Sequence, residues 1–400
     1  MKASEPGATA PSSRTALRFV LLVGAMSFFA DFAYEGARSI LGPYLAILGA
    51  TGAAVGVVTG FGELAGYGLR LVSGRLADRT RRFWPITIAG YVVQMAAVPA
   101  LALAGSWPAA AALLILERIG KATRNPPRDV MLSHAGKQMG GYGWAFGLHE
   151  ALDQFGALVG PLVVAAVLAG RGDYRLAFAA LAAPAVVTLA LLAAARLLYP
   201  RPEEMESRAP DVQGAGLPRV FWIYLGGAAL VAAGFADFPL IAFHFQRTAR
   251  VTGSWVPVFY AVAMGTSGAG SLVLGRLFDR RGLGILLPLT VVAAAFAPLV
   301  FFGGFWAALA GAALWGLGMG VHESIVPAAV APMVPAARRA SAYGLFTAAY
   351  GLAWFLGSAI IGVLYDRSVT ATAIACVAFQ LAALPLFYAC WRRSPGPPVR

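Results

Sequence analysis

Long runs without any charged residue constrain the fold more than any other feature of this sequence. Residues 83–116 and 282–321 contain no Asp, Glu, Lys or Arg. A helix that crosses the hydrocarbon core of a bilayer needs about 20 apolar residues, so each run is long enough for two crossings. Gly105 and Pro108 interrupt the first run, and the pair Gly303-Gly304 interrupts the second. The sequence therefore predicts pairs of membrane-spanning helices.

The composition agrees with a membrane protein. Hydrophobic residues make up 59% of the 400 residues, charged residues only 12%, and the mean hydropathy is +0.71. A soluble domain carries about 25% charged residues, so an ordinary soluble protein is disfavoured. Applying the same length criterion along the whole chain predicts twelve spanning helices. Their approximate limits are 18–45, 53–75, 83–104, 109–131, 143–169, 175–198, 219–244, 255–277, 283–303, 305–330, 340–364 and 369–391.

The distribution of basic residues predicts the orientation in the membrane. The formal net charge is +13, from 31 Lys and Arg against 18 Asp and Glu. With the N-terminus in the cytoplasm, most Lys and Arg fall in cytoplasmic segments, as the positive-inside rule requires. We therefore expect a multi-pass protein of the cytoplasmic (inner) membrane with both termini in the cytoplasm. Its basic residues then set the orientation of the helices in the lipid bilayer. We expect no nucleic acid as a partner.

A charged segment occurs twice, at a separation of half the chain. GRLADRTRR at residues 74–82 and GRLFDRR at residues 275–281 each follow an apolar span. A second repeat, AFGL at residues 145–148 and AYGL at residues 342–345, lies near the start of the fifth and eleventh expected helices. These repeats indicate two six-helix halves in parallel register. The expected N-terminal tail, N-terminal bundle, cytoplasmic linker, C-terminal bundle and C-terminal tail are residues 1–17, 18–199, 200–218, 219–391 and 392–400.

Two parallel six-helix halves are the plan of one class of membrane transporters, and the repeated segment resembles a loop signature of the major facilitator superfamily. The matching residues of its two copies are Gly74, Asp78, Arg79, Gly275, Asp279 and Arg280. The resemblance covers the whole chain and implies an all-α membrane protein of twelve transmembrane helices in two pseudo-symmetric six-helix bundles. It implies alternating access, with these residues as a conformational latch. The alternative is that the arginines only set topology, and Thr80 and Arg81 replace the usual glycine.

Two shorter motifs are similar to signatures of the proton-coupled antiporters within that superfamily. Gly156, Gly160 and Pro161 in the fifth expected helix match a Gly-x-x-x-Gly-Pro pattern. Small residues four apart let two helices approach closely. Residues 116–122 are similar to an Arg-x-x-Gly-x-Gly-x-Ala pattern but depart from it at their end. This resemblance favours proton-coupled efflux of a small molecule.

Ionisable residues inside the expected spans are candidate functional residues, because a charge at membrane depth costs on the order of 3 kcal/mol. Asp31, Glu35 and Arg38 share one face of the first helix. The resemblance places helices 1, 4, 7 and 10 around a central cavity. Together with acids of the fifth helix, the expected cavity and proton-relay residues are Asp31, Glu35, Arg38, Arg118, Glu150, Asp153, Asp237 and Glu323. We expect Asp31, Glu35 and Glu150 to carry the proton; the alternative is structural pairing, such as Glu35 with Arg38.

Other classes of function remain as alternatives. His149-Glu150-x-x-Asp153 is similar to the HExxH helix of zinc hydrolases, but Asp153 replaces the second histidine. With His322 and Glu323 this set could bind a divalent metal, so a carrier of a metal or metal chelate is one alternative. An intramembrane enzyme or a sensor is another. The chain has only four His and no Gly-x-x-x-x-Gly-Lys-Ser/Thr loop. We therefore expect a monomer that takes a small-molecule substrate and protons, with no enzyme activity, no cofactor and no resident metal.

Overall fold

The computed structural model describes residues 13–138, 142–200, 217–326, 329–330, 333–334 and 339–393. Within these ranges it does not describe the side chains of residues 13–14, 78, 133–138, 142–147, 279 and 339–341. The described part of the chain is helical and contains no strand.

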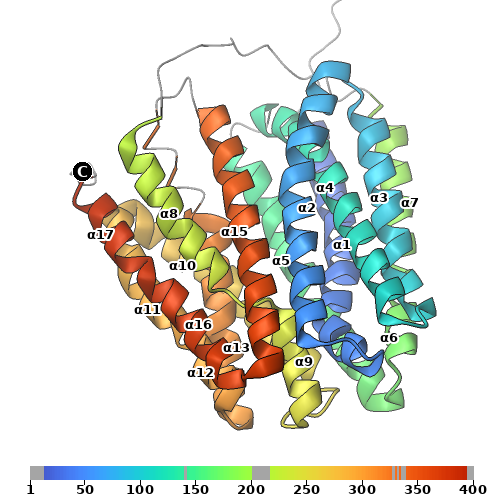
Figure 1. Ribbon diagram of the computed structural model, residues 1–400. Helices are drawn as coiled ribbons and strands as arrows, with labels where there is room; N and C mark the ends of the chain where they lie inside the picture. The colour runs from blue at the N-terminus through green and yellow to red at the C-terminus, as the bar shows by residue number, and fades with distance from the viewer. Residues whose placement is uncertain are drawn as a thin grey trace, which may run out of the picture.

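The helices follow one another as antiparallel rods (Figure 1). Those of the first half are α1 (Ser13–Ile47), α2 (Gly52–Thr80), α3 (Phe83–Ala100), α4 (Trp107–Gln138), α5 (Tyr142–Arg171), α6 (Tyr174–Ala180) and α7 (Ala182–Leu198). Those of the second half are α8 (Arg219–Ala233), α9 (Phe238–Thr248), α10 (Val256–Arg281), α11 (Leu286–Ala294), α12 (Phe296–Phe302), α13 (Phe305–Gly320), α15 (Arg339–Arg367), α16 (Val369–Ala382) and α17 (Leu384–Trp391).

Each of four spans is divided into two helices, and each division lies shortly before a proline. The breaks lie at residue 181, at residues 234–237, at residue 295 and at residue 383. The prolines that follow them are Pro184, Pro239, Pro298 and Pro385. A proline ring clashes with the carbonyl group four residues earlier and removes a backbone donor, so the helix is interrupted about one turn before it. Each of these pairs (α6–α7, α8–α9, α11–α12 and α16–α17) therefore makes one bent crossing.

Each of the twelve expected spans coincides with a described helix or helix pair. Among the described residues, ten of them are long and apolar enough to cross a membrane. The other two, α2 and α4, have 29 and 32 residues. At 1.5 Å per residue they are about 43 and 48 Å long, but they carry more charged and polar side chains. The fold is therefore a set of twelve transmembrane helices in two six-helix bundles.

The two bundles repeat the same close helix packing. In the first bundle α1 packs against α5, and in the second α8 packs against α15. A Cβ atom at Gly160 of α5 would overlap the carbonyl oxygen of Phe32 in α1. A Cβ atom at Gly357 of α15 would overlap the carbonyl oxygen of Ala233 in α8. Glycine thus lets each pair of helices touch through its backbone, and the same contact occurs in both halves.

The bundles meet along a seam in which α2 packs against α15, α5 against α10 and α1 against α9. We call the end of the molecule at which α1 begins the linker face, and the opposite end the far face. At the far face the bundles touch closely, since a Cβ atom at Gly42 would overlap the Pro239 carbonyl oxygen. Nearer the linker face, the atoms nearest to a Cβ atom at Gly351 belong to the side chain of Tyr67 and not to a backbone. The bundles converge at the far face and diverge toward the linker face (Figure 1).

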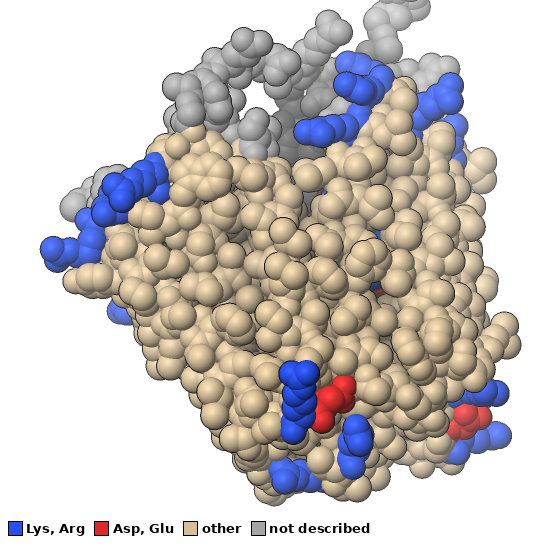
Figure 2. Space-filling model, viewed as in Figure 1, with Lys and Arg blue, Asp and Glu red and all other residues tan. Residues whose placement is uncertain are grey.

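Charged side chains lie near the two ends of the surface that Figure 2 shows, with a broad band of other residues between them. Exposed apolar side chains of the spanning helices include Val72 of α2 and Leu352 and Leu356 of α15. Such a band suits the hydrocarbon core of a bilayer, whereas the charged ends suit its headgroups.

Candidate functional site

The first charged cluster joins α1 to α3 and α4. The Oδ1 atom of Asp31 lies 3.3 Å from Nη2 of Arg124 and 3.7 Å from Nζ of Lys121. Arg124 is fully buried, and it also donates to Oε1 of Gln94 at 2.6 Å and to the hydroxyl of Tyr91 at 2.8 Å. Because a guanidinium group donates in a fixed fork, this arginine fixes the positions of three helices relative to one another.

The second cluster centres on Glu63 of α2. Its Oε1 atom lies 2.9 Å from Nη2 of Arg118 and 3.3 Å from Nη2 of Arg38. The sequence spacing offered Glu35 as a partner for Arg38. The structure pairs Arg38 with Glu63 instead, because α2 brings one carboxylate between two guanidinium groups. Glu35 is left free to turn toward the other bundle.

Glu35 forms a hydrogen bond across the seam. Its Oε2 atom accepts from the hydroxyl of Tyr260 in α10 at 2.5 Å, and the two residues are 225 positions apart. Both side chains are buried. A phenol hydroxyl binds a carboxylate more strongly than a neutral carboxyl group. The state of this one carboxyl group therefore changes the strength of a contact between the bundles.

Asp237 forms a second group of contacts across the seam. It lies in the break between α8 and α9 and is buried. Its carboxylate accepts from Trp354 Nε1 at 2.9 Å and from Ser358 Oγ at 2.8 Å, both on α15 of the same bundle. It also accepts from Thr59 Oγ1 of α2 at 2.9 Å, which links the two bundles.

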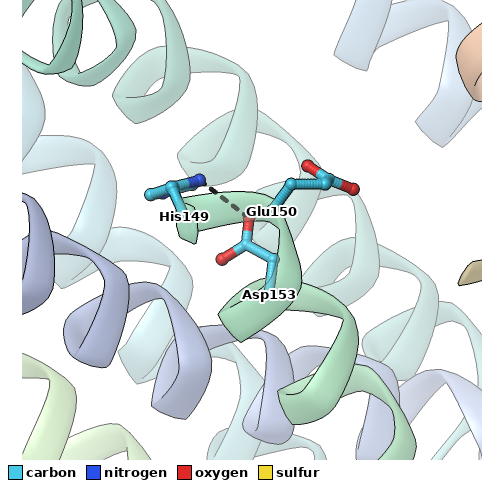
Figure 3. Close-up of side chains that lie close together, drawn as sticks. All are labelled: His149, Glu150 and Asp153. Carbon is cyan, nitrogen blue, oxygen red and sulfur yellow. Dashed lines mark ion pairs between the residues drawn. The ribbon is translucent and has the colours of Figure 1, made fainter. Parts of the chain in front are cut away.

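The motif on α5 has its side chains on different sides of the helix (Figure 3). His149 is buried, and its Nδ1 atom lies 3.7 Å from Oδ2 of Asp153. Glu150 extends away from the His149 ring (Figure 3), is exposed, and accepts from Gln154 Nε2 at 2.9 Å. One ligand atom from each of His149, Glu150 and Asp153 lies within 4.8 Å of the others. By donor type alone this set suits a divalent metal.

A basic group lies next to this motif. The Nε2 atom of His149 is 2.9 Å from Oγ of Ser27, and Arg128 Nη1 donates to the same oxygen at 3.1 Å. Arg128 in turn lies 2.8 Å from Asp129. A guanidinium group this close repels a bare divalent cation. The surroundings of His149 therefore favour a neutral imidazole held by hydrogen bonds over a metal ligand.

The second bundle contributes His322 and Glu323 from a π-helix, Val321–Ile325, that follows α13. Such turns hold one extra residue and occur frequently at functional sites. His322 hydrogen-bonds to the hydroxyl of Tyr350. Glu323 is exposed, and so is Glu150 of α5 in the other bundle, although both acids lie on spanning helices.

The repeated charged segment lies at the linker-face ends of α2 and α10. Arg79 and Arg280 are exposed. The side chains of Asp78 and Asp279 lie outside the part of the chain that the structure describes. The latch that the motif suggests therefore stays a prediction.

The glycines of the repeated segment make no close contact with the other bundle. A Cβ atom at Gly74 would meet only the ring of Pro126 at 3.6 Å, and one at Gly275 would meet nothing within 4 Å. The two copies end differently. Arg81 adopts a left-handed backbone with φ of 52°, whereas Gly282 ends α10 with φ of 62°. The first copy thus has an arginine where the backbone favours glycine.

Three residues in contacts between the bundles were missed in the sequence. Tyr260 and Thr59 offer only a hydroxyl group, which is common in membrane helices and gives no signal. Asp366 is different, because it is an acid at the far-face end of α15, where few acids occur. Its carboxylate binds the first backbone N–H groups of α2. That contact depends on residues far apart in the chain, so spacing could not predict it.

Comparison with known proteins identifies the family. The model of the Major Facilitator Superfamily matches residues 22–358 and 238–400. The chain belongs to this superfamily. It is therefore a multi-pass membrane protein of a transporter family.

The relatives and solved structures agree with this family. Uncharacterized proteins of Mycobacterium bovis and Mycobacterium tuberculosis are 44% identical over 394 residues, which is 96% of this chain and of theirs. An MFS-type transporter of Methanocaldococcus jannaschii is 31% identical over 141 residues, or 35% of each chain. The nucleoside transporter NupG superposes with a TM-score of 0.74 at 15% identity over 94% of this chain and 100% of its own. A bacterial homologue of the human lysosomal transporter Spinster gives 0.71 at 15% identity over 96% and 98%.

Proposed function

We propose that this superfamily member is a proton-coupled exporter of a small molecule that works by alternating access. The linker face is cytoplasmic in this proposal, and the protein acts as a monomer in the inner membrane. The excess of Lys and Arg in the expected cytoplasmic loops and tails supports the orientation. The Gly156, Gly160 and Pro161 motif supports export, since it is similar to the antiporter signature. The backbone contact that these glycines allow between α1 and α5 also supports it.

The observation that carries proton coupling is the hydrogen bond between Glu35 and Tyr260. An ionised Glu35 accepts a charge-assisted bond from the other bundle, and a protonated Glu35 accepts a weaker one. Proton binding therefore loosens a contact that must change when the bundles rock. Asp237 is a second carboxylate at which proton binding would weaken a contact between the bundles, because Thr59 donates a hydrogen bond to it across the seam.

Proton flux in proteoliposomes tests this proposal. Purified protein is reconstituted with a pH-sensitive dye inside, and a library of drugs, metabolites and metal chelates is added outside. Wild-type protein should move protons with at least one compound. Glu35→Gln should abolish this flux but leave binding of that compound measurable. Asp129→Asn is the matched control, since Asp129 is partly exposed and paired with its neighbour Arg128, and it should keep wild-type flux.

Two results would contradict the proposal. One is substrate transport by Glu35→Gln with an unchanged pH profile, which removes Glu35 from the coupling. The other is transport by the wild-type protein that is unaffected when the proton gradient is collapsed. Either result leaves a transporter in place, but only the second takes away the proton as its driving ion.

A carrier of a divalent metal or metal chelate is a second candidate. The observation in its favour is the set of ligand atoms from His149, Glu150 and Asp153 within 4.8 Å. The hydrogen bonds of Arg128 beside this set argue against a bare ion, so a chelate is the better form. Loading proteoliposomes with Ni²⁺, Zn²⁺ or their chelates and measuring metal by mass spectrometry tests it. His149→Ala should abolish metal transport if this candidate is correct.

A further inference from the structure

A carboxylate of the second bundle caps a helix of the first bundle at the far face. Asp366 lies near the end of α15, and its Oδ1 atom accepts from the backbone N–H of Gly52 at 2.7 Å. Its Oδ2 atom accepts from the N–H of Ala53 at 2.8 Å. These are the first residues of α2, where the N–H groups have no partner within the helix and carry partial positive charge. A carboxylate is the group that best satisfies them.

The side chains around this cap hold it in place. A Cβ atom at Gly52 would lie 2.5 Å from a ring carbon of Tyr365 and 2.9 Å from Asp366 Oδ1. Only glycine therefore lets α15 come this close. The hydroxyl of Tyr365 lies 3.0 Å from Nδ1 of His244, which ties α15 to α9 at the same end of the molecule. The aspartate is thus presented by a fixed part of the second bundle.

Among the residues that the structure describes, this contact exists on one side of the seam only. By the parallel repeat, α10 corresponds to α2, and α5 to α15. The N-terminus of α10 follows Trp255 and has no side-chain cap. On the side of α5 and α10, a hydrogen bond at the far face joins two neutral groups, the hydroxyl of Tyr174 and Oε1 of Gln246, at 3.3 Å. The charged contact therefore has no counterpart in the pseudo-symmetric position.

We propose that Asp366 and the α2 N-terminus form a lock that holds the far face closed. We call the contact of Asp366 with Gly52 and Ala53 the far-face lock. Every opening of the far face has to break it, because its two partners belong to different bundles. The inference rests on the proposed alternating access. It adds a contact that sets the equilibrium between the closed and the open far face. Removing the lock leaves closure to the apolar contacts and shifts this balance toward the open state.

Distance measurements between spin labels test the lock without any substrate. Labels on Leu103 and Trp306, which are 85% and 77% exposed on different bundles, report the far face of the full chain in lipid nanodiscs. Labels on Leu76 and Leu345 report the linker face. The native Cys376 and Cys390 are buried and are replaced by alanine in all samples. Pulsed electron spin resonance then gives the fraction of molecules with an open far face.

Asp366→Ala should raise the ratio of open to closed far face by about fivefold to thirtyfold, or about 1–2 kcal/mol. Asp366→Asn keeps one oxygen acceptor without its charge and should give an intermediate shift. Asp173→Ala is the matched control. Asp173 caps α6 of its own bundle by accepting from Arg175 N–H at 2.8 Å, so its loss should leave the ratio unchanged.

The outcomes separate the lock from the proposed function. An unchanged far-face distance in Asp366→Ala, in a variant that melts like the wild type, overturns the lock. If Glu35→Gln or a change of pH still moves the two distances in opposite directions, alternating access stands without it. An equal shift in Asp173→Ala also overturns the lock, because any far-face acid would then have the same effect.

Discussion

Replacing Arg124 by methionine tests whether the buried charges hold the first bundle together. Arg124 is 0% exposed. Its guanidinium donates to Asp31, Gln94 and Tyr91 at 3.3, 2.6 and 2.8 Å. Methionine keeps an unbranched apolar stem but leaves a buried carboxylate and an amide oxygen without this donor. Breaking one half of a buried ion pair costs about 3–5 kcal/mol. Lys121 remains 3.7 Å from Asp31 and compensates in part, so we expect a loss of about 3–4 kcal/mol in the free energy of unfolding.

Unfolding in mixed detergent micelles, followed by circular dichroism, measures this loss. Arg70→Met is the control, because Arg70 is exposed and its guanidinium lies over the ring of Tyr67 at 5.7 Å. It should change stability by less than about 0.5 kcal/mol. The double variant of Arg124→Met with Asp31→Asn removes the unpaired charge and should recover part of the loss. If Arg124→Met is as stable as Arg70→Met, the network does not hold these helices and the reasoning fails.

Three further predictions follow from the packing and from the repeated segment. Gly160→Ala places a methyl group against the Phe32 carbonyl and should cost about 1–3 kcal/mol, whereas Gly170→Ala in the same helix meets open space and should be neutral in a thermal melt. Arg81→Gly should stabilise the protein by about 0.5–1 kcal/mol in the same melt, because it relieves the left-handed backbone; a similar gain from Arg81→Ala would contradict this. Asp78→Asn should slow transport but leave substrate binding near normal, because a latch controls conformation rather than affinity. Loss of binding in folded Asp78→Asn protein would rule out the latch.

The number and limits of the helices could be predicted because membrane thickness acts on sequence directly. A span needs about 20 apolar residues, and the charge-free runs meet that requirement whatever their neighbours are. The splits inside four spans were not predicted. They depend on which prolines interrupt a helix and which are tolerated, since Pro161 lies within α5 without breaking it and Pro239 follows a break.

The partners of the buried charges could be predicted only where they are neighbours in the chain. Arg128 binds Asp129, as local pairing suggests. Arg38 shows the limit of this reasoning. Glu35 is three positions away, yet a carboxylate 25 positions away, Glu63, takes the guanidinium. Spacing along a helix tells which side chains share a face, but not which helix that face meets.

Contacts between the halves were beyond prediction for the same reason. Tyr260 is 225 positions from Glu35, and Asp366 is 314 positions from Gly52. The parallel repeat predicts that the halves have like folds. It does not predict which side chains pair across the seam, nor that the Asp366 contact is found in only one of the two halves among the described residues.

The charged face of α1 has a consequence for how the protein is made. Asp31, Glu35 and Arg38 leave the ribosome before any of their partners, which lie on α2, α4 and α10. Three ionic groups on one lone helix would cost on the order of 8–10 kcal/mol in lipid, at about 3 kcal/mol each. This first helix must therefore wait beside the insertion machinery until α2 and α4 arrive, and the early helices enter the membrane as a group. The helices of the second half, in which Asp237 is a buried acid, can enter nearly one by one.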